Sequence, residues 1–339
     1  MSNSRLRNYT RRQFLENASV LSAASLLGWS QTAAAEPPPE IKKIRLVHTP
    51  TICFAPQLFA EELLRLEGFS EIEYVDLKVN TPSNEVASGR ADMSMTAAPE
   101  VVAVLDETES VLVVGGIHAG CYELFGNERV QTIQQLKGRR VVVSALGSPE
   151  HIYISSIVAY LGMDPRKDLN WIVAKSSADA MQLFIDNKAD AFLGFPPQPQ
   201  DLRLRKVGHV IIDTSKDRPW SQYFCCVVAA NKQFVSKYPV ATKRVLRAML
   251  KGADMCATDP QKVAKYLVAR NYESRYDVAL EVIKELSYRR WREANPEDTI
   301  RFHALRLHEV GMIKSNPRQL IARCSDWRFF NELKKELKS

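Results

Sequence analysis

A twelve-residue segment of this chain occurs twice. Residues 88–99 (SGRADMSMTAAP) are echoed by residues 186–197 (DNKADAFLGFPP). Each copy has a Gly or Asn that can end a helix, a basic residue before Ala-Asp, an apolar run, and then small residues or prolines. This order predicts a helix end, a strand and a loop. Because open α/β sheets bind ligands at the carboxyl ends of their strands, the repeat predicts two lobes whose loops face a shared cleft.

The alternation of strands and helices continues on both sides of the repeat. Strands are expected at 43–47, 72–75, 91–95, 111–114, 141–143, 171–173, 189–193, 210–212 and 224–229. From residue 236 onward the apolar residues recur at helical spacing. The sequence therefore predicts an α/β, two-lobed fold in which each lobe is a mostly parallel sheet flanked by helices, with a helical C-terminal extension.

The repeat also suggests where the lobes begin and end. We expect residues 36–123 to form the first part of lobe one, residues 124–222 to form lobe two, and residues 223–339 to return to lobe one and add the C-terminal helices. The two passages between the lobes, near residues 123–124 and 223–224, would form a hinge.

The N-terminus has the pattern of an export signal. The segment TRRQFL at residues 10–15 has the twin-arginine arrangement, residues 18–29 are mildly apolar, and residues 33–35 are three alanines that offer a cleavage site. We expect residues 1–35 to be a twin-arginine signal peptide and the mature chain to begin near Glu36, in the periplasm. The apolar stretch is too short for a stable membrane span, so the expected product is soluble.

Charge and length exclude some classes of protein. The chain has 339 residues and a net charge of +7, and it is long enough for two cores. Four arginines and one glutamate in the first 35 residues account for +3 of that charge. The remaining basic residues are scattered without interleaved aromatic residues, which argues against a nucleic-acid partner. We expect a monomer.

All six cysteines lie in the mature chain, and they are widely and irregularly spaced. We expect buried free thiols. One disulfide is the alternative, but the spacing does not indicate which two cysteines would form it. The adjacent pair Cys225 and Cys226 lacks the spacing of a zinc site. No metal and no cofactor are predicted.

Several short motifs in order carry a family resemblance. They are the opening strand with its proline-bearing loop, GRAD at 89–92, LKGRRV at 136–141 before a Gly-Ser loop, LGM at 161–163, ADA at 189–191 and FVSKYP at 234–239. Over about residues 43–270 the chain resembles the SsuA/THI5-like (NMT1-like, nitrate/sulfonate/taurine type) periplasmic solute-binding proteins of ABC importers. The resemblance implies a type II binding-protein fold that closes on a small molecule by hinge motion and delivers it to a membrane permease.

Two other functions stay open on the same scaffold. One is an exported enzyme of pyrimidine or amine chemistry, and the other is a ligand-sensing module for a membrane receptor. The superfamily includes a thiamin-pyrimidine synthase branch that consumes its own active-site histidine, but the cysteine-rich motif of that branch is absent here. No nucleophile elbow, zinc-protease motif, phosphate loop or dinucleotide fingerprint occurs either. We therefore expect a binding protein that is not an enzyme.

The resemblance implies that five loops, each following a strand, contact the ligand. The candidate ligand-binding residues are Thr51, Cys53, Phe54, Thr96, Ala97, His118, Cys121, Ser144, Gly147, Ser148, His151, Gly194, Phe195 and Tyr223. Hydroxyl groups could donate hydrogen bonds, small residues could let the backbone approach a ligand, and aromatic rings could form apolar walls. For most of these residues, a structural role in capping a turn or packing the core explains the sequence as well as ligand contact does.

The charges on these loops argue against a simple anion. The loop at 144–148 leads into a helix N-terminus, which suits an anion or a polar oxygen. However, Glu150 in the first helical turn would repel an anion, and none of the five loops carries Lys or Arg. We therefore expect a neutral, aromatic or zwitterionic solute. Asp92 and Asp190, at matching strand starts, are expected to be structural residues.

Overall fold

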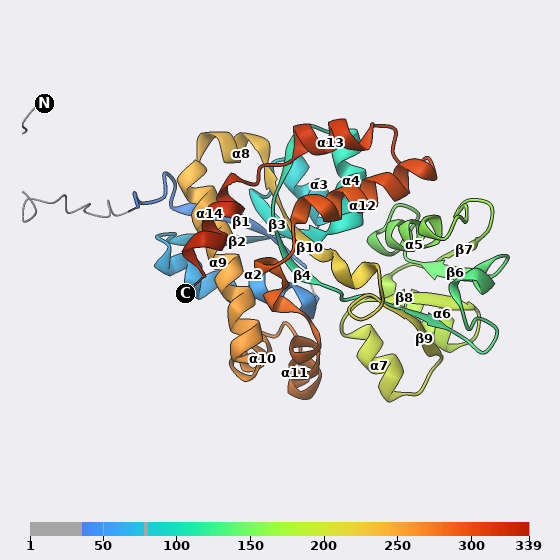
Figure 1. Ribbon diagram of the computed structural model, residues 1–339. Coiled ribbons are helices and arrows are strands. Elements are labelled where there is room, and N and C mark those ends of the chain that lie inside the picture. Colours follow the sequence, from blue (N-terminus) through green and yellow to red (C-terminus); the bar gives the residue numbers. More distant parts are fainter. Residues whose placement is uncertain (1–35, 50, 78–80, 339) are drawn as a thin grey trace, which may run out of the picture. The chain divides into compact units, whose positions relative to one another are not determined.

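The computed structural model describes residues 36–49, 51–77 and 81–338. Residues 38–339 form one compact unit, shown in Figure 1. The expected signal peptide at 1–35 lies outside the described residues and stays a prediction.

The first lobe is built on a five-stranded sheet with the order β2-β1-β3-β10-β4. Strand β10 runs antiparallel to both of its neighbours, and β1 is parallel to β2 and β3. The strands are β1 (Lys43–His48), β2 (Glu71–Asp76), β3 (Met93–Ala97), β4 (Val111–Ala119) and β10 (Phe224–Asn231).

The second lobe repeats this plan with the order β7-β6-β8-β5-β9. Here β5 is the antiparallel strand between β8 and β9, and β6 is parallel to β7 and β8. The strands are β5 (Glu123–Gly126), β6 (Arg140–Val143), β7 (Asn170–Val173), β8 (Ala191–Gly194) and β9 (His209–Asp213). Each sheet thus receives its antiparallel strand from the chain just after it crosses from the other lobe, and the predicted two-lobed α/β fold is confirmed.

The repeated Ala-Asp segments occupy equivalent central places, at β3 and β8. Asp92 accepts hydrogen bonds from the backbone N–H (2.8 Å) and the guanidinium of Arg45 on β1. In the other lobe Asp190 accepts the same set from Arg140 on β6, with the backbone N–H at 3.0 Å. Each aspartate therefore joins two parallel strands, and the structural role expected for the pair is confirmed.

Helices cover both sheets, and those of the C-terminal part lie on the first lobe (Figure 1). The first lobe carries α2 (Ala55–Leu66), α3 (Pro82–Ala87), α4 (Ala98–Glu107), α8 (Lys232–Lys237), α9 (Pro239–Thr258), α10 (Pro260–Ala269), α11 (Tyr276–Glu285), α12 (Pro296–Glu309), α13 (Pro317–Cys324) and α14 (Arg328–Glu336). The second lobe carries α5 (Pro149–Tyr160), α6 (Ser177–Ile185) and α7 (Gln198–Leu204). Short 3₁₀ turns add η1 (Ile52–Phe54), η2 (Ile133–Leu136), η3 (Trp220–Gln222) and η4 (Tyr288–Arg292). Over the described residues, no helix combines the length and apolar character needed to cross a bilayer.

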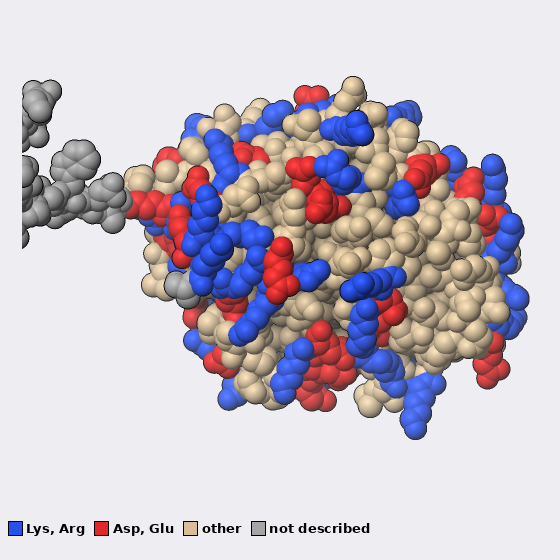
Figure 2. Space-filling view, viewed as in Figure 1, with Lys and Arg blue, Asp and Glu red and all other residues tan. Residues whose placement is uncertain are grey.

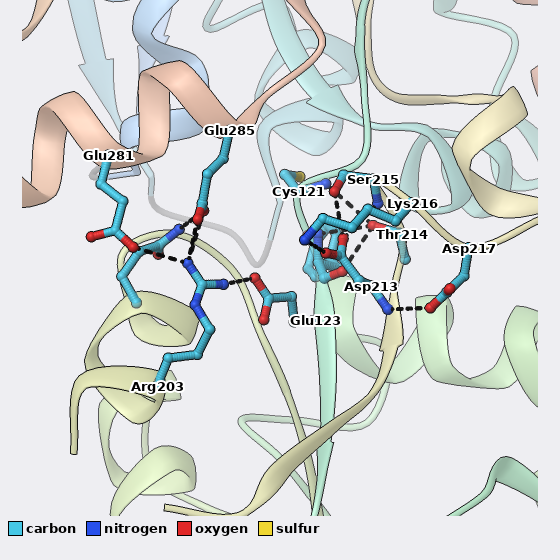
Figure 3. Close-up of polar contacts among 12 residues, drawn as sticks. Cys121, Glu123, Arg203, Asp213, Thr214, Ser215, Lys216, Asp217, Glu281 and Glu285 are labelled. Atoms are coloured by element: carbon cyan, nitrogen blue, oxygen red, sulfur yellow. Dashed lines mark hydrogen bonds and ion pairs between the residues drawn. The ribbon is translucent and has the colours of Figure 1, made fainter. Parts of the chain in front are cut away.

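The two connections between the lobes are tied to each other. Thr214 donates its hydroxyl to the carbonyl of Tyr122 (2.9 Å), and its oxygen accepts the N–H groups of Cys121 and Tyr122. Figure 3 labels Thr214 and Cys121 in this region. Gly120 beside them has φ +61°, and a Cβ there would collide with the Ser215 backbone. These connections lie close to the expected lobe boundaries at 123–124 and 222–223, which stay predictions.

The lobes touch on both sides of the connections. On one side α5 packs against α4 and α12, and Ser156 shares a hydrogen bond of 3.0 Å with His303. On the other side α7 forms ion pairs with α11 and the turn before it. Arg203 pairs with Glu285 at 2.7 Å and with Glu281, and Arg275 pairs with Asp201 at 2.6 Å. The lobes are closed on each other.

Candidate functional site

A cavity of about 80 Å³ lies between the lobes. It is lined by Thr49, Thr51, Cys53, Phe54, Pro82, Ala97, Glu100, Cys121, Tyr122, Pro149, Phe195 and Cys226. The first lobe and the connection after β4 contribute most of this wall, and Pro149 and Phe195 come from the second lobe. Ligand pockets usually have about 300–1,000 Å³, so a form that holds an organic solute between both walls would have its lobes somewhat farther apart than they are here. We call this space the interlobe cavity.

Six of the fourteen predicted site residues line the interlobe cavity: Thr51, Cys53, Phe54, Ala97, Cys121 and Phe195. The other eight lie outside its wall: Thr96, His118, Ser144, Gly147, Ser148, His151, Gly194 and Tyr223. Their contact with a ligand stays a prediction. Sequence reasoning missed Glu100, Tyr122 and Cys226 in particular, which lie in a helix, a connection and a strand.

The first loop joins the two lobes directly. Thr51 donates its hydroxyl to the carbonyl oxygen of Pro196, 3.1 Å away, in the loop after β8 that ends the second copy of the repeat. Its hydroxyl also lies 3.2 Å from the Cys53 sulfur. The Phe54 ring completes this part of the wall. The loops that follow β1 and β8 thus meet at the cavity.

Thr96 and Ala97 were expected to follow their strand, but they are its last two residues. Both pair with β10, because Thr96 is opposite Val227 and Ala97 is opposite Cys226. Ala97 lines the cavity, whereas the Thr96 hydroxyl donates to Glu100 at 2.7 Å. The first repeat therefore contributes Ala97 to the cavity wall, and its Thr96 holds the Glu100 carboxylate by a hydrogen bond.

Glu100 is the acidic group of the interlobe cavity. It lies in the first turn of α4 with an exposed fraction of 1%, and it also accepts the Ser83 N–H at 3.2 Å. Burial raises the pKa of Glu100, and the hydrogen bonds from Thr96 and Ser83 partly offset that rise. None of the described residues that line the cavity is Lys or Arg. A Glu in a helical first turn is a common N-terminal feature, so the sequence offered no signal for it.

His118 corrects an expectation, because it does not lie on an exposed loop. It belongs to β4 and is fully buried. Its Nε2 lies 3.1 Å from the Cys53 carbonyl oxygen, and it stands opposite Cys226 across the β4–β10 pair. Burial lowers the pKa of His118, but other interactions, chiefly those with Cys226, together outweigh that effect and leave the pKa raised. His118 therefore supports the cavity wall from behind.

The cysteines are free and buried, as expected. Three of them, Cys53, Cys121 and Cys226, bring their sulfur atoms within 4.8 Å of one another at the cavity wall. Burial raises the pKa of Cys121. Although burial acts in the same direction on Cys226, hydrogen bonds from the neighbouring thiols lower the pKa of Cys226. These three residues are called the thiol cluster below.

Polar groups of the loop at 144–148 form hydrogen bonds with Glu150 and His151 in the first turn of α5. The carboxylate of Glu150 accepts the Ser144 N–H at 2.8 Å and also its hydroxyl. Ser148 caps α5 by accepting the N–H of His151, and Gly147 donates its N–H to His151 Nδ1 at 3.0 Å. Burial lowers the pKa of His151. A carboxylate thus already occupies a position where an anionic ligand would bind.

Gly194 and Tyr223 also lie away from the cavity wall. Gly194 is the last residue of β8. Tyr223 stacks on Phe302 with ring centroids 4.3 Å apart, in a separate surface depression beside α12. Lys and Arg side chains lie among Asp and Glu side chains over the face seen in Figure 2, so that face has no single-sign field.

Comparisons with known proteins agree with this architecture. The structure matches the periplasmic nitrate-binding protein NrtA from Synechocystis PCC 6803 with a TM-score of 0.74 and 14% identity, covering 89% of this chain and 90% of that one. It matches the alkanesulfonate-binding protein SsuA from Xanthomonas axonopodis pv. citri, bound to MOPS, with a TM-score of 0.68 and 16% identity, over 87% and 100%. These likenesses show the fold of periplasmic binding proteins.

A curated relative in sequence is 4-amino-5-hydroxymethyl-2-methylpyrimidine phosphate synthase THI11 of Saccharomyces cerevisiae. It is 22% identical over 250 residues, which is 68% of this chain and 70% of the relative. The family model described as NMT1/THI5 like matches residues 68–263, more than half of the chain. With the duplicated sheets and their exchanged strands, this match shows that the chain belongs to the NMT1/THI5-like family.

Proposed function

We propose that the chain is the substrate-binding component of an ABC importer, exported to the periplasm, that closes on a small organic solute and delivers it to the permease. The observation that carries this proposal is the interlobe cavity, whose wall combines residues of both lobes. A ligand held by both walls stabilises the closed form over the open one, which is how a solute signals its presence by hinge closure.

The wall favours a neutral, aromatic or zwitterionic solute over a simple anion. Phe54, Tyr122 and Phe195 offer aromatic surface, and the described lining residues include no Lys or Arg. Glu100 can accept a hydrogen bond from an N–H or ammonium group of the solute. A sulfonate or nitrate would instead meet a buried carboxyl group, with no Lys or Arg among the described lining residues to neutralise either charge.

Thermal unfolding tests this proposal. A solute that binds only the folded chain raises its melting temperature by mass action, so amines, amino acids and pyrimidines should raise it while sulfonates and nitrate leave it unchanged. Glu100→Gln should weaken binding of the best amine about 10- to 100-fold, as expected for loss of a charge-assisted hydrogen bond. Glu107→Gln, exposed on the same helix, is the matched control and should bind as the wild type does.

A panel without any shift, together with native mass spectra that show no co-purified small molecule, would contradict the proposal. An enzyme is the second candidate, because the yeast relatives are named as pyrimidine phosphate synthases. Mass spectrometry of the released compound separates the two functions. A binding protein returns its solute unchanged, whereas an enzyme converts it, and His118→Ala or His151→Ala would abolish that conversion in a folded chain.

A further inference from the structure

The thiol cluster brings together three distant parts of the chain. Cys53 lies in η1, Cys121 in the connection after β4, and Cys226 in β10. Their sulfur atoms are within 4.8 Å of one another, and each residue is at most 5% exposed. Cys121 lies in a connection between the lobes, and Cys226 lies in the strand that follows the other connection. Because the three cysteines are far apart in sequence, they meet only in the folded chain.

The position of the cluster differs from that of two other buried cysteines. Cys256 lies in α9 and Cys324 in α13, and neither lines the interlobe cavity. All three cysteines of the cluster do line it. Free cysteines often serve as small apolar residues in cores, but three sulfur atoms converging on one wall of a cavity form a set of donors.

The surroundings support such a donor set. His118 stands opposite Cys226 in the sheet, is fully buried and is fixed by the contact of its Nε2 with the Cys53 carbonyl oxygen. Its Nδ1 is buried without a hydrogen bond of ordinary geometry to any described residue. The Thr51 hydroxyl, 3.2 Å from the Cys53 sulfur, contacts the cluster from the side of the first loop. Neighbouring polar groups of this kind orient the ligands of metal sites.

We propose that Cys53, Cys121 and Cys226 bind one thiophilic metal ion at the wall of the interlobe cavity, with Cu⁺ preferred to Zn²⁺. Thiolate sulfur selects soft ions of this kind over Mg²⁺ or Ca²⁺.

The preference for Cu⁺ over Zn²⁺ follows from the number of donors. Zn²⁺ in proteins almost always has four ligands, whereas the group formed by the described residues has three. Zn²⁺ would therefore need water or solute from the cavity as its fourth ligand. The site does not depend on the proposed transport function, because binding involves the isolated chain alone.

Metal titration of the full chain tests the site. The chain is reduced, freed of reductant under anaerobic conditions and titrated with Cu⁺ against a chromophoric Cu⁺ chelator, and separately with Zn²⁺ against a Zn²⁺ indicator. We expect one Cu⁺ per chain, a sulfur-to-metal charge-transfer band and a raised melting temperature. Cys53→Ser, Cys121→Ser and Cys226→Ser should each weaken binding at least about 100-fold, a loss at the upper end of that seen when only a supporting group is removed.

Cys256→Ser and Cys324→Ser are matched controls and should bind Cu⁺ as the wild type does. If the cluster variants fail to fold, X-ray absorption of the loaded wild type counts sulfur neighbours without any substitution, and three are expected. Failure of wild-type chain to bind either ion at one per chain would overturn the proposal. So would two or fewer sulfur neighbours, or a disulfide between any two of the three cysteines in the exported protein. Stoichiometric Zn²⁺ binding without Cu⁺ binding would overturn the stated preference.

Discussion

Buried titratable side chains carry much of what is specific to this chain at the scale of single residues. Glu100 lines the cavity, His118 supports its wall, and His303 of α12 reaches the second lobe. His303 is 1% exposed, and burial lowers its pKa to about 3. Its neutral ring shares a hydrogen bond with Ser156 across the lobes. A charge on this ring would be buried, and burial of a charge costs free energy.

His303 should therefore make the protein sensitive to acid. The folded chain keeps the ring neutral down to about pH 3, whereas the unfolded chain takes up the proton near its ordinary pKa of 6.5. Stability is thus present above pH 6.5 and is lost as the pH falls toward 3. Between pH 7 and pH 5 this linkage should lower the free energy of unfolding by about 2 kcal/mol.

Urea unfolding of His303→Asn at both pH values checks this. The variant should be less stable at pH 7 because packing is lost, but its stability should fall less between pH 7 and pH 5. His308→Asn, exposed on the same helix, should leave the pH dependence unchanged. Parallel pH profiles for His303→Asn and the wild type would show that His303 does not cause the acid sensitivity.

The central strand pairs are the critical contacts at the scale of elements. In each lobe an aspartate at the start of one strand accepts the backbone and the guanidinium of an arginine on the next. The pKa of Asp190 is lowered well below its usual range, chiefly by its hydrogen bonds to Arg140. Parallel strands are far apart in sequence and have no hairpin to set their register, so these charged contacts help to set it.

Asp190→Asn keeps the shape of the side chain but removes its charge. We expect it to lower the free energy of unfolding by about 1.5–3 kcal/mol, the range for hydrogen bonds to charged groups. Asp186→Asn, four residues earlier and more exposed, is the control and should change stability little. Denaturant unfolding at pH 7 measures both, and equal midpoints for the two variants would contradict the expected role of Asp190.

The balance between open and closed lobes belongs to the scale of the whole molecule. In one lobe contact α5 packs on α4 and α12 and shares the Ser156–His303 hydrogen bond, and the other contact is ionic, where α7 meets α11. Figure 3 shows Arg203 between Glu123 and the α11 carboxylates. Arg203 and the buried Glu123 belong to the same lobe, so their ion pair would survive opening of the lobes. Opening would separate Arg203 from Glu285 on the other lobe. The ionic contact is therefore the one that a few substitutions can weaken.

Arg275→Ala removes the ion pair with Asp201 across the lobes. Because partly exposed ion pairs contribute at most about 1 kcal/mol, the equilibrium should move toward the open form by up to about fivefold. Small-angle X-ray scattering should show a larger radius of gyration at low salt. Arg205→Ala, exposed just after α7, should scatter as the wild type does. An unchanged radius for Arg275→Ala would mean that the Arg275–Asp201 ion pair does not contribute to holding the lobes together.

The sequence by itself determined the fold class, because the Ala-Asp repeat and the alternation of strands and helices are local signals. It also predicted that the two repeat copies face a shared cleft, and Ala97 and Phe195, one from each copy, both line the interlobe cavity. It misplaced His118, because glycines on either side of it resemble a loop. In the structure Gly115 and Gly116 lie in β4, where Phe330 and Phe224 pack so closely that a Cβ would collide with their rings.

Only the tertiary structure decided which side chains form the cavity wall. Glu100 lies in a helix, and Cys226 lies in a strand that reaches the first sheet after passing through the second lobe. Cys53, Cys121 and Cys226 are far apart in sequence, and no spacing rule relates them. Periodicity reports which face of an element is buried, but it does not report which buried faces meet. That depends on the exchange of β5 and β10 between the lobes.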